Sequence, residues 1–146
     1  MTLAKYTIQI PTTDNEGNQL ADLASAAHES LFRYGPQSNQ VQGTKIYRGV
    51  AGNWRSDAQE IFDELITYAE DTPEMDSTMK ELATHVAEIA NQWGVMVFKE
   101  GEDAPKMWMM QHPNATGEGP ADPSALSGGV ASDALTAALK TRKAPI

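Results

Sequence analysis

The sequence predicts an α+β domain followed by an extended C-terminal arm, on three observations. Short stretches in which apolar and polar residues alternate indicate strands. Two longer stretches with apolar residues every three or four positions indicate helices. The order of these stretches is β-α-β-β-α-β, which is typical of a two-layer ferredoxin-like sandwich. We therefore expect a four-stranded antiparallel sheet with both helices on one face.

The first half of the chain supplies a strand, a helix and a hairpin. The stretch KYTIQIP, residues 5–11, alternates apolar and polar side chains as a strand buried on one face does. Apolar residues then recur at helical spacing from Leu20 to Tyr34, before a Gly-Pro pair. The β-branched and aromatic residues of 41–54 and 64–70 predict a hairpin, and its glycines indicate a bulge.

The second helix has the clearest pattern in the chain. Apolar residues recur from Met75 to Trp93 at spacings of 4, 3, 4, 3 and 4. Thr72 is the expected N-cap and Pro73 the expected first helical residue, whereas Gly94 is expected to end the helix. The stretch VMVFKE that follows predicts the last strand of the sheet.

Composition restricts the chemistry that the chain can perform. Its 146 residues carry a net charge of −9 and include no cysteine, which excludes disulfides, thiolate metal ligands and a cysteine nucleophile. Residues 57–88 hold ten acidic residues and one basic residue, a balance that disfavours nucleic-acid binding. No stretch resembles a signal peptide or a membrane span, so we expect a cytoplasmic protein.

The segment that follows the last predicted strand raises the question of a partner. We place the domain at residues 1–103 and the Gly/Pro/Ser-rich arm at 104–146, with a short helix at 132–143. The open face of the sheet is expected to present apolar side chains, and the arm begins with four more. We expect the four apolar side chains of the arm to cover that face as a lid, to pair as an edge strand, or to contact another molecule. The expected partner-binding residues are Met96, Phe98, Met107, Trp108, Met109, Met110, Leu135 and Leu139.

Three functions fit these patterns. The first is a non-catalytic protein-binding or assembly protein that uses its open sheet face and its arm, through a protein partner or self-association. The second is a small-molecule-binding protein or enzyme that uses the sheet face. The third is an acidic nucleic-acid mimic that acts as an inhibitor. The expected ligand contacts of the second are Tyr47, Arg48, Trp54 and Arg55.

No motif predicts catalytic residues, a metal site or a cofactor. Glu81, His85 and Glu88 share one face of the second predicted helix, but that face points away from its apolar stripe. We interpret this group as a solvated histidine between two carboxylates.

Overall fold

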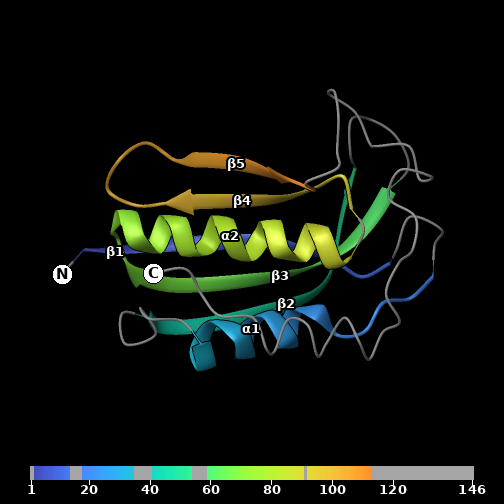
Figure 1. The fold of residues 1–146 in the computed structure, drawn as a ribbon. Helices are drawn as coiled ribbons and strands as arrows, with labels where there is room; N and C mark the ends of the chain where they lie inside the picture. The colour runs from blue at the N-terminus through green and yellow to red at the C-terminus, as the bar shows by residue number, and fades with distance from the viewer. Residues whose placement is uncertain (1, 14–17, 35–40, 54–58, 91, 113–146) are drawn as a thin grey trace.

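The computed structural model describes residues 2–13, 18–34, 41–53, 59–90 and 92–112. Five strands and two helices make up this part of the chain (Figure 1). In chain order they are β1 (Leu3–Pro11), α1 (Leu23–Tyr34), β2 (Val41–Asn53), β3 (Gln59–Glu70), α2 (Pro73–Ile89), β4 (Gly94–Glu100) and β5 (Lys106–Gln111).

The strands form one antiparallel sheet in the order β2-β3-β1-β4-β5. The prediction of an α+β fold with an antiparallel sheet and two helices is therefore confirmed, but the sheet has five strands where four were expected. The additional strand β5 comes from the segment that the sequence assigned to the arm. The sheet thus extends past residue 103, and the predicted helix at 132–143 lies outside the described residues.

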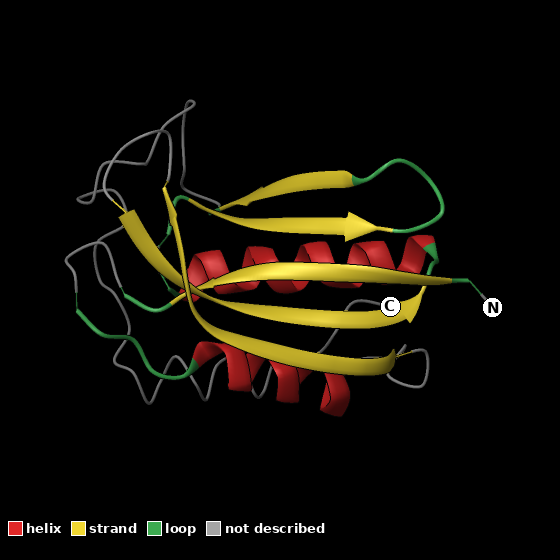
Figure 2. Ribbon diagram, turned by 180° about the vertical axis from the view of Figure 1, so that it is seen from behind, coloured by secondary structure: helices red, strands yellow, loops and turns green. Residues whose placement is uncertain are grey.

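Both helices pack on one face of the sheet (Figure 2). Alternate side chains of β1 are buried, as KYTIQIP predicts, and Tyr6, Ile8 and Ile10 are each at most 1% exposed. In β4 the buried residues Val95 and Val97 point the same way. These side chains meet the apolar stripe of α2, which includes Met75, Met79, Leu82 and Val86, and form one core between the two layers.

Helix α2 begins as predicted and ends earlier. The side chain of Thr72 accepts a hydrogen bond from the backbone N–H of Met75, and Pro73 is the first helical residue. The last helical residue is Ile89, and the N–H of Gln92 donates to the carbonyl of Ala87 across the helix end. Trp93 therefore does not belong to the helical stripe to which its spacing assigned it. No helix in the described residues has the length and apolar character to cross a membrane.

A bulge in β2 directs Arg48 toward α1. The pairing of β2 with β3 shifts between Tyr47 and Val50, where Gly49 has a φ of 69° that other residues rarely adopt. Arg48 donates to Asp22 at 2.6 Å, next to the first turn of α1, and to Asp63 of β3 at 3.0 Å. The Arg48 guanidinium lowers the pKa of Asp22 to about 2. This network fastens α1 to two strands.

A second polar cluster lies beneath the first turn of α2. The Nζ atom of Lys99, on β4, is 2.7 Å from a carboxylate oxygen of Asp71 and 2.8 Å from one of Asp76. The hydroxyl of Tyr6 donates to Asp76 at 2.6 Å. Only 9% of the Lys99 side chain is exposed, so this ammonium group is buried between two carboxylates.

Candidate functional site

The sheet face opposite the helices is open. Met96 and Phe98 alternate with the buried valines of β4 and point to this face, as the sequence predicted. On β1, Thr7 and Gln9 point the same way, and Thr7 is paired with Phe98. The open face is thus apolar over β4 and polar over the middle of β1.

The four apolar residues of β5 divide between the two faces. Met96 is paired with Met109 and Phe98 with Met107, so both methionines join the open face. Trp108 and Met110 pair with buried valines and pack against the core on the helix side. Nζ of Lys80, on α2, lies 4.8 Å from the centre of the Trp108 ring. Residues 107–110 therefore pair as an edge strand and do not cover the open face as a lid.

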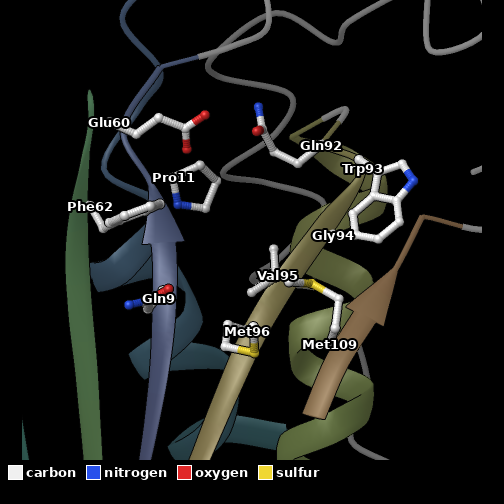
Figure 3. Close-up of a pocket in the computed structure, with 10 residues that line it drawn as sticks. All are labelled: Gln9, Pro11, Glu60, Phe62, Gln92, Trp93, Gly94, Val95, Met96 and Met109. Carbon is white, nitrogen blue, oxygen red and sulfur yellow. The ribbon is translucent and has the colours of Figure 1, made fainter. Parts of the chain in front are cut away.

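A groove runs across one end of the open face, where β1, β3 and β4 meet the chain after α2 (Figure 3). It comprises two adjoining cavities of about 90 and 150 Å³, which share Pro11, Glu60, Phe62 and Gln92. Figure 3 shows the Glu60 carboxylate and the Gln92 amide at one end and the sulfur atoms of Met96 and Met109 at the other. A ligand in this groove meets a carboxylate, aromatic rings and thioethers together.

Backbone features shape both ends of the groove. The Gln92 side chain donates to the carbonyl of Thr13, so the segment after α2 is held to the end of β1. Gly94 leaves room for the Met109 side chain, because a Cβ atom there would lie only 2.5 Å from the methionine sulfur. Trp93 follows the end of α2 and lines the groove together with Gly94.

Glu60 supplies the negative charge of the groove. Glu60 is an exposed residue, but the protein atoms beside its carboxylate remove some of the surrounding water and raise its pKa above the ordinary value of 4.5. Among the described residues that line either cavity there is no lysine, arginine or histidine. The groove therefore favours a positively charged or neutral ligand over an anion.

The residues predicted as ligand contacts are not gathered in the groove. Tyr47 lies on the open face of β2 and is 50% exposed, whereas Arg48 turns to the helix side and is held by Asp22 and Asp63. They therefore cannot contact one small ligand together. The predicted contacts Trp54 and Arg55 lie outside the described residues, as do the predicted partner contacts Leu135 and Leu139.

The acidic stretch 57–88 does not form one surface in the described residues. Asp63 is hydrogen-bonded to Arg48, and Asp71 and Asp76 are paired with the buried Lys99. Nδ1 of His85 lies 4.0 Å from Glu88 on the outer side of α2. No group of three or more histidine, aspartate or glutamate side chains in the described ranges is arranged to hold a metal ion. Asp63, Asp71 and Asp76 of the acidic stretch are thus paired with basic groups within the fold.

Comparison with known proteins identifies a similar fold. No family model matches the chain, and no curated protein sequence matches it. Among solved structures, a phage SAM lyase in complex with S-methyl-5'-thioadenosine superimposes with a TM-score of 0.50. The similarity covers 75% of this chain and 89% of the lyase chain at 12% sequence identity. The two chains are thus similar in fold.

Proposed function

We propose that the protein binds a small organic cation of the sulfonium class, represented by S-adenosylmethionine, in the groove of the open face. The observation that carries this proposal is the place of Glu60, an exposed carboxylate in the wall of the groove whose neighbours include Phe62 and Pro11. A carboxylate next to aromatic and apolar groups attracts a cation that carries apolar substituents. Among the described lining residues no basic side chain opposes that charge.

The fold supports the proposal from a separate direction. The chain shares its arrangement of strands and helices with a SAM lyase whose structure holds a nucleoside thioether. We interpret β1 to β4 with the two helices as a ferredoxin-like unit to which β5 is added at the edge, in a cytoplasmic protein. The two cavities enclose only part of a ligand of this size, so the rest of it would lie along the open sheet.

Replacement of Glu60 by Gln tests the electrostatic part of the proposal. We expect the affinity for S-adenosylmethionine to fall about tenfold, because the sulfonium loses its nearest anion. The affinity for the neutral S-methyl-5'-thioadenosine should not change. In the unchanged protein, affinity for the cation should fall as the pH is lowered through the raised pKa of Glu60, since the protonated carboxyl has no charge. Calorimetric titration with both ligands between pH 4 and pH 8 measures these effects.

Glu64→Gln is the matched control. Glu64 lies on the same strand and the same face but does not line the groove, and it is paired with Gln9. Equal losses in the two variants, or an unchanged affinity in Glu60→Gln, would contradict the proposal. Chromatography of the incubated ligand then separates two classes of protein. Release of S-methyl-5'-thioadenosine faster than in a protein-free incubation identifies an enzyme, and release at the protein-free rate identifies a binding protein.

A second candidate function is protein binding through the open face. The observation that favours it is the apolar surface over β4 and β5, where Met107 is 61% exposed beside the half-buried Phe98. We expect Phe98→Lys to abolish any assembly through this face, because a charge at its centre would have to be desolvated. Light scattering at increasing protein concentration measures the change. Association that Phe98→Lys leaves unchanged does not occur through the open face.

A further inference from the structure

The outer edge of β5 is a part of the fold that can pair with a strand from another molecule. In the described residues β5 pairs with β4 on one side and is the last strand of the sheet. An edge strand without protection presents unpaired backbone groups to any extended chain. The residues between Lys106 and Gln111 are all large and apolar, and β5 contains no proline.

The backbone direction of each β5 residue follows from one hydrogen bond. The N–H of His112 donates to the carbonyl of Trp93 at 2.9 Å, so this pair continues the ladder between β5 and β4. Backbone groups alternate sides along a strand, and those of Met110 and Trp108 therefore also point to β4. It follows that the N–H and C=O groups of Met107, Met109 and Gln111 point away from the sheet.

These three residues are symmetrically spaced about Met109. If a second copy of the chain places its β5 antiparallel along the edge, Met109 faces Met109 across a two-fold axis, and Met107 faces Gln111. This register forms about six backbone hydrogen bonds. It also places Trp108 of each copy opposite Met110 of the other on the helix side, a favourable contact between an aromatic ring and a thioether.

The opposite edge of the sheet lacks these properties. Strand β2 has two register shifts, carries Lys45 and Arg48, and contains three glycines. Bulges and charges of this kind are what natural proteins use to prevent edge pairing. Strand β5 has a regular register and no acidic residue, although the chain has a net charge of −9. Strand β5 itself therefore adds no acidic repulsion between two acidic copies.

We propose that two copies of this chain associate through their β5 edges, in the register centred on Met109, to form one continuous ten-stranded sheet. The proposal does not rest on the ligand groove, although the Met109 side chain also lines it, and it concerns the backbone edge of the sheet rather than its open face. Since one two-fold axis relates the copies, the assembly closes at two chains.

Met109→Pro tests this contact in the full-length protein. Proline removes the outward N–H at the axis and leaves the ladder to β4 intact, because that N–H does not point to β4. Light scattering should give twice the monomer mass for the unchanged protein and the monomer mass for Met109→Pro. Met109→Lys, which places two ammonium groups across the axis, should raise the dimer dissociation constant at least tenfold. Circular dichroism establishes that each variant is folded.

Met109→Leu and Phe98→Lys are the controls. Met109→Leu keeps the N–H and an apolar side chain, and it should retain the dimer. Phe98→Lys changes the open face and not the edge, so it should retain the dimer as well. A monomeric unchanged protein, an assembly larger than two chains, or a dimer that survives both Met109→Pro and Met109→Lys overturns the proposal. A dimer lost only in Phe98→Lys also overturns it, since the contact is then the open face.

Discussion

Replacement of Lys99 by Met is expected to lower the free energy of unfolding by about 3 kcal/mol. The methionine fills most of the same volume but leaves Asp71 and Asp76 without the ammonium group that lies 2.7 and 2.8 Å from them. Water reaches these carboxylates poorly, because less than a fifth of each side chain is exposed. Loss of one partner from a buried pair costs far more than loss of a surface pair.

The pH range of this contribution follows from the pKa of Lys99. Burial of the side chain opposes its charge, but the hydrogen bonds to Asp71 and Asp76 outweigh burial, and the pKa is raised above 10.5. A lysine with a raised pKa in the folded protein contributes stability in full below its unfolded pKa. That contribution is lost as the pH rises through the folded value. The stability difference between the two proteins should therefore persist through neutral pH and shrink only in strong alkali.

Lys106→Met is the matched control for this experiment. Lys106 is the direct cross-strand neighbour of Lys99 on β5, but it is exposed and forms no ion pair that the structure records. Its replacement should change the free energy of unfolding by less than about 0.5 kcal/mol. Urea unfolding followed by circular dichroism measures both variants. A loss below about 1 kcal/mol for Lys99→Met would mean that the cluster adds little to stability.

Elements with a strong local signal could be predicted from the sequence. The alternation of β1 and the 3–4 spacing of α2 depend on one buried face each, and the N-cap at Thr72 needs only its own neighbours. The end of α2 could not be predicted in this way. The spacing from Ile89 to Trp93 continues the helical stripe, but the helix ends at Ile89 and Trp93 lines the groove.

No local sequence pattern predicts strand β5 or the groove, and the reason is physical. An edge strand that buries one face and extends an apolar open face shows no alternation, so residues 107–110 could not be assigned from pattern alone. The groove is formed where the ends of three strands meet, and Glu60 and Trp93 are 33 positions apart in the sequence. The local sequence feature at the groove is Trp93 followed by Gly94, shortly after the end of α2.

Trp108→Ala is expected to lower the free energy of unfolding by about 2 kcal/mol, because the ring packs against the core and lies under Lys80. Met107→Ala, one residue earlier on the opposite face, should cost less than about 0.5 kcal/mol, since Met107 is 61% exposed. Urea unfolding of both variants in the Met109→Pro background removes any contribution from association. Equal effects of the two replacements would mean that the helix-side contacts of β5 do not stabilise the domain. The expected difference would establish that the segment assigned from the sequence to an arm belongs energetically to the sheet, because a strand fixed in register gives adjacent residues unequal roles and a loosely held arm does not.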